Sequence, residues 1–454
     1  MRLAVVGTGY VGLVSGVCLA SVGHKVICVD VSPERVAAIS RSEVPFYEPG
    51  LGELLSKVLA NGSLRATIDL REAVISSEVS LIAVGTPFVG DSIDLSYVTT
   101  ATEQIGLALR HTPGYHVVAI KSTVLPGTTD TLVRGILEQT SGIRVGGVGL
   151  CVNPEFLRES SAVNDFMQPD RIVIGQWDEE SGRVLAEVYK SFDCPLFFTS
   201  LRDAELIKNV SNAFLATMIS FCNEIAALCE VTPGTDVEVV MKGLHLDHRL
   251  SPIVDRQRII PGILSYLRAG CGFGGSCLPK DVNALRTYAR ERGKLPHLLD
   301  AVMAVNAERP AQLVDLAEKI VGSLCGSTVA VLGLAFKPGT DDVRNSPALD
   351  IIDRLLNKSA IVRAYDPLIT KTACAAIDER VTLCETPEAT LTGVDAALLV
   401  TAWPEFANWD WAFLSEKMRH RVIIDGRNAL HEVPLPDGVT YASVGRTLKR
   451  EHMA

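Results

Sequence analysis

The sequence lacks the features that mark secreted, membrane-spanning and zinc-binding proteins. Met1 is followed at once by a short apolar run that ends in glycines, which is not the pattern of a secretory signal. No apolar run approaches the length of a membrane span, so we expect no membrane partner. The 11 cysteines are odd in number, scattered and without a C-x-x-C pair, which argues against a disulfide framework or a metal site. These absences favour a cytoplasmic protein with reduced thiols and no bound metal.

The chain also lacks an excess of positive charge. It has 43 Lys and Arg against 53 Asp and Glu, a formal net charge of -10. This balance argues against nucleic acid or anionic lipid as partners, and an anionic substrate must be met by a local group of Lys and Arg. With 47% hydrophobic and 21% charged residues, the composition is that of a globular protein, and 454 residues predict two or three domains.

Short apolar runs alternate with amphipathic stretches at both ends of the chain, as in parallel α/β sheets. Between them, Leu206, Val210, Phe214 and Phe221 recur at helical spacing with no Gly or Pro before Pro233, which predicts one long helix over 203–230. Its apolar stripe should pack against a neighbouring domain or a second subunit. A second helical stretch covers 298–324. Strands are predicted at 3–6, 26–29, 79–84, 117–120, 148–152, 171–174, 328–332, 361–365, 396–400 and 422–424.

A glycine-rich turn follows the first predicted strand. Gly7, Gly9 and Gly12 form a GxGxxG pattern that opens a helical stretch, and Asp30 ends the second strand. Such glycines let the backbone approach a pyrophosphate at a helix N-terminus, while the acid binds the adenosine ribose and repels a 2'-phosphate. The pattern therefore predicts NAD rather than NADP, the alternative being a purely structural turn.

These patterns together predict an α/β protein of three parts. An N-terminal Rossmann-type NAD domain covers 1–200, and a central helical domain with the long helix covers 201–322. A C-terminal Rossmann-like domain covers 323–454, because Asp366 closes its second strand but the turn from Gly333 to Lys337 lacks the remaining glycines. That turn is therefore not expected to bind a second NAD.

Cys277 is the strongest candidate for a nucleophile. It follows a run of glycines and precedes Pro279 and Asp281, which suit the first turn of a helix. A thiol at a helix N-terminus and beside Lys280 is favoured as the reactive thiolate. The alternative, an inert buried thiol, better suits the cysteines in apolar stretches, which are Cys18, Cys222 and Cys229.

Other candidate side chains occur at strand ends and on the long helix. Lys208 and Asn212 lie four residues apart and share a helix face, where an ammonium and an amide could stabilise an oxyanion. Glu155 and Glu159 follow a predicted strand and could orient water or carry protons. Thr123 follows another strand, where its hydroxyl could reach cofactor or substrate. For the Lys208 and Asn212 pair and for the two glutamates, the alternative is an ordinary solvated helix surface or helix start.

The chain resembles the UDP-glucose and GDP-mannose dehydrogenase family over nearly its whole length. The motifs are GTGYVG, VGTP, KSTVLPGT, NPEFLRE, the K-x-x-x-N helix, GFGGSCLPKD and GLAFKPGTDDVRNSP, in this order. The resemblance implies that Cys277 forms a thiohemiacetal and then a thioester, with Lys208 and Asn212 at the oxyanion. It also implies that Asp281, Thr123 and Glu159 handle protons and the hydrolytic water.

The resemblance further implies which residues surround the two ligands. In relatives the arginine equivalent to Arg249 can come from a second subunit, which implies a homodimer through the central helix. The residues implied for NAD are Gly7, Gly9, Tyr10, Val11, Gly12, Asp30, Arg35, Thr86, Thr123, Glu159 and Arg344. Those implied for the nucleotide sugar are Glu155, Phe156, Leu157, Lys208, Asn212, Arg249, Phe273, Gly274 and Lys337. The resemblance also implies that the C-terminal domain, 323–454, binds the nucleotide sugar, with its diphosphate held by Lys337 and backbone groups of the turn.

The candidate residues fit a four-electron oxidation of a sugar C6 alcohol with two NAD, because an oxidation that stops at the aldehyde needs no cysteine. Ser276 argues against the N-acetylhexosamine branch, whereas Leu278 is usual in the GDP-mannose branch, and the segment 250–267 is longer than is typical. UDP-glucose is favoured and GDP-mannose is the alternative. Two other functions stay open: a two-electron hydroxyacid dehydrogenase of the 6-phosphogluconate type, and a non-catalytic NAD-responsive binding protein.

Overall fold

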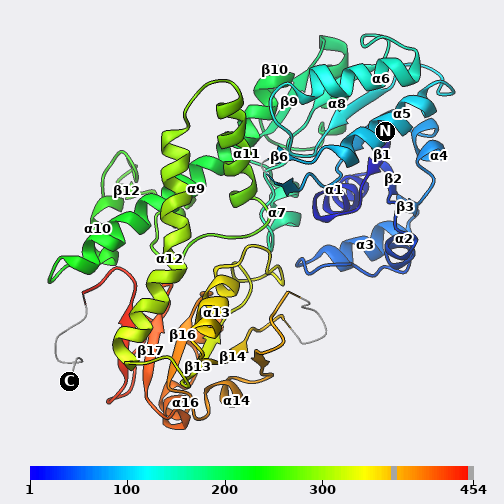
Figure 1. Cartoon of the computed structure of the whole chain (residues 1–454). Helices are drawn as coiled ribbons and strands as arrows, with labels where there is room; N and C mark the ends of the chain where they lie inside the picture. The colour runs from blue at the N-terminus through cyan, green and yellow to red at the C-terminus, as the bar shows by residue number, and fades with distance from the viewer. Residues whose placement is uncertain (91, 370–375, 448–454) are drawn as a thin grey trace. The chain divides into compact units, whose positions relative to one another are not determined.

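The computed structural model describes residues 1–90, 92–369 and 376–447, and the chain divides into two compact units (Figure 1). The first unit comprises Met1–Ser211 and Thr287–Arg292, and the second comprises Asn212–Arg286 and Gly293–Ala454. The boundary falls inside the long helix α9 (Leu201–Val231). The bounds of this helix are close to the predicted range 203–230. The three predicted domain ranges stay a prediction.

The first unit is built on an eight-stranded sheet of order β10-β9-β8-β7-β4-β1-β2-β3. All neighbouring strands are parallel except β8 and β9, which are antiparallel. Six neighbouring strands of this sheet, β8-β7-β4-β1-β2-β3, have the order of a dinucleotide-binding fold. The strands are β1 (Arg2–Val6), β2 (Lys25–Val29), β3 (Leu64–Thr67), β4 (Val79–Ile82), β7 (Val117–Ile120), β8 (Gly149–Val152), β9 (Ile172–Gln176) and β10 (Leu196–Ser200).

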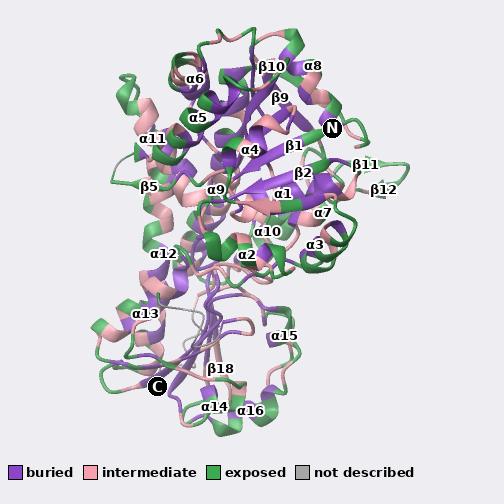
Figure 2. Cartoon of the chain, turned by 90° about the vertical axis from the view of Figure 1, so that its right-hand side faces the viewer, coloured by how far each residue is buried: buried purple, intermediate pink, exposed green. Residues whose placement is uncertain are grey.

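Helices cover both faces of this sheet, because alternate residues of its strands enter different cores. Leu3 and Val5 of β1 belong to one core, and Ala4 and Val6 belong to the other. The central strands are accordingly among the most buried segments (Figure 2). The first core includes α1 (Tyr10–Ser21), α2 (Pro33–Ser40), α3 (Leu51–Ala60), α7 (Ala162–Met167) and α8 (Glu179–Val188), and the second includes α4 (Leu70–Ile75), α5 (Ser96–Leu109), the π-helix η1 (Thr128–Val133) and α6 (Arg134–Ser141). A short hairpin of β5 (Phe88–Val89) and β6 (Ser92–Ile93) precedes α5.

The second unit carries a six-stranded parallel sheet of order β15-β14-β13-β16-β17-β18. This strand order is the same as that of β3-β2-β1-β4-β7-β8 in the first sheet. The predicted second α/β domain is thus confirmed in its topology. The strands are β13 (Thr328–Leu332), β14 (Ile361–Tyr365), β15 (Thr382–Leu383), β16 (Ala396–Leu399), β17 (Val422–Asp425) and β18 (Thr440–Ser443), and the helices are α13 (Pro347–Asn357), α14 (Pro387–Leu391), α15 (Pro404–Ala407) and α16 (Trp411–Lys417).

Helical segments make up the rest of the second unit. In it the C-terminal part of α9 packs with α10 (Val237–His245), with the first turns of α11 (Leu278–Glu291) and with α12 (His297–Val321), the helix predicted at 298–324. The segment 250–267 forms a hairpin of β11 (Ile253–Val254) and β12 (Gln257–Arg258), followed by the short 3-10 helix η2 (Gly262–Tyr266). Asp255 and Arg256 adopt positive φ values of 49° and 62° at the hairpin turn.

Helix α9 corrects one expectation from the sequence. It is long and apolar enough, by length and composition, to cross a membrane, although the sequence was expected to hold no such run. The helix nevertheless buries polar side chains that hydrogen-bond to protein atoms, such as Asn209 and Asn223. A helix of a globular core passes the same test, so this is weak evidence for a membrane. All cysteines in the described part of the chain are free thiols, and Cys374 lies outside it.

Candidate active site

The glycine turn between β1 and α1 has the geometry that a dinucleotide needs. Gly7 has a φ of 95°, and a Cβ on it would lie 2.9 Å from the backbone oxygen of Ala83. A Cβ on Gly12 would lie 1.9 Å from the oxygen of Gly7, so both glycines are required by packing. A Cβ on Gly9 would meet nothing within 4 Å, so the protein itself does not require glycine there. The space at Gly9 fits the close approach of a pyrophosphate to the N-terminus of α1.

Asp30 lies next to this turn, as predicted. Its Oδ2 accepts hydrogen bonds from the backbone N and the Oγ1 of Thr8, at 2.9 and 2.6 Å, and its Oδ1 accepts from the N of Ser32 at 3.0 Å. The guanidinium of Arg35 lies 3.5 Å away. Burial alone would raise the pKa of Asp30, but these hydrogen bonds and Arg35 outweigh it and hold the pKa below its usual value. Asp30 is therefore an ionised acceptor at the strand end.

Glu48 is a buried carboxylate that the sequence reasoning missed. It accepts a hydrogen bond from the hydroxyl of Tyr10, in the glycine turn, and one from the backbone N of Ser160 at 2.8 Å. Ser160 has a φ of 68° and directly follows Glu159. Glu48 thus joins the cofactor turn to the segment that carries the candidate acid Glu159. The only sequence signal was its place in an apolar, proline-rich loop.

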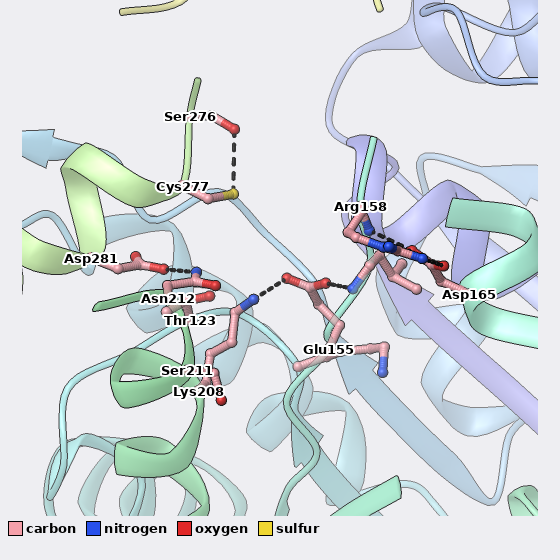
Figure 3. Close-up of polar contacts among 12 residues, drawn as sticks. Thr123, Glu155, Arg158, Asp165, Lys208, Ser211, Asn212, Ser276, Cys277 and Asp281 are labelled. Atoms are coloured by element: carbon pink, nitrogen blue, oxygen red, sulfur yellow. Dashed lines mark hydrogen bonds and ion pairs between the residues drawn. The ribbon is translucent and has the colours of Figure 1, made fainter. Parts of the chain in front are cut away.

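Lys208 and Glu155 form a buried ion pair, with Nζ to Oε1 at 3.0 Å (Figure 3). The two side chains are only 5% and 7% exposed. The other oxygen of Glu155 accepts from the N of Leu157 at 2.6 Å, and the ammonium lies 5.7 Å from the ring centre of Phe156. The structure therefore brings together four residues predicted at the substrate, and Glu155 fixes where the ammonium points.

A second buried lysine lies in the same unit and was not predicted to have a role. Lys121 is 4% exposed, and its Nζ donates to the Oδ1 of Asn153 at 2.9 Å. The pKa of Lys121 is lowered to about 8, chiefly by burial; the charge of Glu155 opposes this shift and the charge of Lys208 adds to it. Nearby, the hydroxyl of Thr86 donates to the backbone oxygen of Thr123 at 2.8 Å, which joins two residues predicted at the cofactor.

Cys277 lies in the second unit, directly before α11. Its backbone oxygen accepts the hydrogen bond from the N of Asp281 at 2.9 Å, which makes it the residue that begins the helix, as predicted. The Cys277 residue is exposed, and its sulfur lies 3.5 Å from the Oγ of Ser276 (Figure 3). A thiol at this position is accessible to a substrate and lies at the positive end of the helix dipole.

Asn212 and Asp281 are joined in the second unit. The Nδ2 of Asn212 donates to the Oδ2 of Asp281 at 2.5 Å (Figure 3), and the ammonium of Lys280 donates to the other oxygen at the same distance. Asp281 is 1% exposed. Lys280, which was expected to act on Cys277, thus neutralises the buried carboxylate of Asp281. Asn212 keeps its second amide hydrogen and its oxygen for other contacts.

The remaining predicted substrate residues differ in their surroundings. Arg249 pairs with Asp247 and its side chain is 88% exposed. Phe273 packs its ring into a hydrophobic cluster with Val282 and Val302, so packing accounts for its side chain. The Nζ of Lys337 lies 5.8 Å from the ring centre of Phe336.

The turn after β13 was expected to bind the nucleotide through Lys337 and backbone groups, but two of its backbone N–H groups are used internally. The N atoms of Leu334 and Ala335 donate to Asp366 at 2.7 and 3.1 Å. Arg344, predicted at the cofactor, holds Asp342 through two nitrogens, at 2.9 and 2.7 Å. Lys337 is therefore the main candidate of this turn for a phosphate.

Comparison with known proteins identifies the family. Residues 1–193, 202–308 and 330–432 match the NAD binding, central and UDP binding domains of the UDP-glucose/GDP-mannose dehydrogenase family. The chain is 41% identical to UDP-glucose 6-dehydrogenase TuaD of Bacillus subtilis (strain 168), over 99% of this chain and 94% of that protein.

Solved structures of other proteins are similar to this chain over its full length. A UDP-glucose dehydrogenase from Pyrobaculum islandicum has a TM-score of 0.88 at 39% identity, covering 98% of both chains. A UDP-D-ManNAc dehydrogenase from Pyrococcus horikoshii has a TM-score of 0.85 at 31% identity, covering 98% of this chain and 99% of that one. The chain therefore belongs to the UDP-glucose/GDP-mannose dehydrogenase family of NAD-dependent nucleotide-sugar dehydrogenases.

Proposed function

We propose that this enzyme oxidises the C6 alcohol of UDP-glucose to the carboxylate of UDP-glucuronate and reduces two NAD per sugar. The observation that carries the proposal is the exposed Cys277 at the first turn of α11, in a chain whose first unit has the glycine turn and the acid of an NAD site. Two NAD, bound there one after the other, would each accept one hydride. A thiol is needed only if the aldehyde is oxidised further.

The chain's own residues can carry each step after the first oxidation. The thiolate of Cys277 adds to the aldehyde carbon, and the ammonium of Lys208 and the amide of Asn212 stabilise the oxygen anion of the thiohemiacetal. Loss of the second hydride leaves a thioester. Water then breaks the carbon–sulfur bond, which gives the carboxylate and returns the thiol.

Two carboxylates hold the groups that stabilise the oxygen anion, and the proton transfers are assigned to other groups of the site as well. Glu155 fixes the ammonium of Lys208, and Asp281 fixes the amide of Asn212. Glu159 and Asp281, with the hydroxyl of Thr123, supply and remove protons and orient the hydrolytic water. Because Lys280 already neutralises Asp281, a proton taken up there would weaken that ion pair.

UDP-glucose is the proposed substrate because two relatives named as UDP-glucose dehydrogenases are 41% and 39% identical to this chain. The UDP-D-ManNAc dehydrogenase is 31% identical. Lys337 is proposed to bind the diphosphate, and Arg249 to bind the sugar nucleotide from a second subunit. Leu278 keeps GDP-mannose as the second candidate.

We further propose a homodimer through α9 in the cytoplasm. Apolar side chains on this helix stay exposed at helical spacing, and burying them against a second copy would remove them from water. The free, mostly buried thiols fit a reducing compartment. The exposed apolar residues of α9 are Leu206, Val210, Phe214, Phe221, Leu228 and Val231.

The test is a count of NADH released per sugar, with UDP-glucose, GDP-mannose and UDP-N-acetylglucosamine as limiting substrates. We expect two NADH from UDP-glucose, and we expect Cys277→Ser to lose the second oxidation. Cys325→Ser, which changes another exposed thiol, is the matched control and should keep both. A limiting value of one NADH for the unmodified enzyme, or full turnover by Cys277→Ser, would favour the two-electron hydroxyacid dehydrogenase instead. No NADH with any sugar nucleotide would support a binding protein.

A further inference from the structure

The loop that precedes Cys277 is held by side chains from other parts of the second unit. Residues 270–275 form no helix or strand, and Gly272 and Gly275 have φ values of 107° and 84°. Such a backbone has little conformational preference of its own. Its course is therefore set by the groups that bind its N–H and C=O groups.

Asn306 of α12 binds the middle of this loop at two points. Its Oδ1 accepts from the N of Phe273 at 2.7 Å, and its Nδ2 donates to the O of Phe273 at 3.1 Å. The side-chain amide thus binds both the N–H and the C=O of Phe273, as a neighbouring strand does in a sheet. Because both backbone groups of Phe273 are used, this residue is fixed in position and in orientation.

Two further side chains bind the start of the loop. The Oδ1 of Asn223 accepts from the N of Gly270 at 2.8 Å, and the Nε of Arg309 donates to the O of Gly270 at 3.0 Å. Arg309 is 2% exposed and its charge is balanced by Glu230 at 3.2 Å. This end of the loop is therefore anchored from α9 and α12.

The end of the loop next to Cys277 is held by the segment that follows β13. The N of Gly275 donates to the O of Arg344 at 2.9 Å, and the Nδ2 of Asn345 donates to the O of Gly275 at 3.2 Å. Asn345 has a φ of 51°, and a Cβ on Gly274 would lie 2.1 Å from its oxygen. The two segments therefore approach so closely that only glycine fits at Gly274.

We propose that Asn306 and Asn345 are positioning residues that hold Cys277 where it captures the aldehyde formed in the first oxidation. The inference rests on the proposed function. The first hydride transfer does not use the thiol, whereas the second requires its prior addition to the aldehyde. A displaced sulfur therefore slows the second oxidation and leaves the first unchanged, and small displacements of reacting groups cost on the order of 100-fold in rate.

The decisive variant is Asn345→Gly, because glycine adopts the positive φ of this position and only the bond to Gly275 is lost. Asn306→Ala removes both bonds to Phe273. Asn408→Gly is the matched control, since it removes an amide-to-carbonyl bond of similar length, from Nδ2 to the O of Pro404 at 3.1 Å, elsewhere in the same unit.

The experiment follows NADH by stopped flow, with enzyme and NAD in excess over UDP-glucose. For Asn345→Gly we expect the first NADH to form at a rate within about two-fold of the unmodified enzyme, and the second to form on the order of ten-fold more slowly. In Asn306→Ala the second NADH should be slowed, relative to the first, more than in Asn345→Gly. In Asn408→Gly neither phase should be slowed. The KM for NAD should stay within about two-fold in all three variants.

The proposal is overturned if Asn345→Gly slows both phases equally or slows neither. Equal slowing would mean a structural role without effect on the thiol. Failure of the proposed function is distinguished by the unmodified enzyme, which would then release one NADH in a single phase. If Asn306→Ala does not fold, the comparison of Asn345→Gly with Asn408→Gly still decides the question.

Discussion

Replacing the buried Lys121 by Met should change how the stability of the first unit depends on pH. Lys121 has a pKa of about 8 in the folded chain against a reference value of 10.5, chiefly because it is buried. Between these two values the unfolded chain binds more protons than the folded chain. The free energy of unfolding therefore rises with pH in this window, and the cost of holding Lys121 charged is fully present below pH 8.

The size of the effect follows from the pKa difference. One pKa unit corresponds to about 1.4 kcal/mol, so the difference between 10.5 and about 8 is worth roughly 3 kcal/mol in all, of which about 2.5 kcal/mol develops between pH 7 and pH 10. Lys121→Met lacks this titration. Between pH 7 and pH 10 the free energy of unfolding of the unmodified protein should therefore rise by about 2.5 kcal/mol more than that of the variant. This holds whatever the difference in stability between the two proteins at pH 7.

Scanning calorimetry of both proteins at pH 7, 8, 9 and 10 measures how the difference in stability between them changes with pH. The contributions of other titrating groups cancel, because both proteins contain them. For a unit of this size the gap in Tm should change by roughly 5–10 °C. Lys190→Met is the matched control, since the side chain of Lys190 is 77% exposed in the same unit, and its gap should not change. A Lys121→Met gap that stays constant from pH 7 to pH 10 would refute the argument.

Two further predictions concern the ion pair and the glycine turn. Lys208→Met should lower the free energy of unfolding by roughly 3–5 kcal/mol because it leaves the charge of the buried Glu155 carboxylate without its ion-pair partner. Adding Glu155→Gln should recover more than half of this loss in calorimetry, and a double variant as unstable as the sum of the two single variants would contradict this. Gly12→Ala places a Cβ 1.9 Å from the oxygen of Gly7, so we expect the KM for NAD to rise at least about ten-fold. Gly52→Ala, where the added Cβ would meet only a side chain at 3.9 Å, is its control, and an equal KM in both variants would argue against the turn's role.

Buried strands and long helices could be predicted from the sequence because their signals are local. The apolar runs of β1, β2 and β7 and the helical spacing in α9 need no knowledge of distant residues. Strands β3, β10, β15 and β18 were missed, and they are the edge strands of the two large sheets. Strand β10 begins with three apolar residues, Leu196 to Phe198, but buries none of its residues fully, so it does not show the long buried run of a central strand.

The candidate site could be predicted where a residue's role depends on its own element. Gly7, Asp30 and Cys277 each lie at the end of a strand or the start of a helix, and the turn or helix start can be read nearby. The supporting contacts could not be predicted, because their partners are distant in the chain. Asn306 lies 33 residues from Phe273, and Glu48 lies 112 residues from Ser160.

Both sheets have an aspartate that ends the second strand and accepts hydrogen bonds from the first turn, Asp30 in one and Asp366 in the other. In the second sheet the same carboxylate also accepts from the indole of Trp403 at 3.1 Å. The acid thus secures the turn whether or not a dinucleotide belongs there. The glycines beside the strand end can therefore differ between the two sheets while the aspartate keeps the backbone of the turn in place.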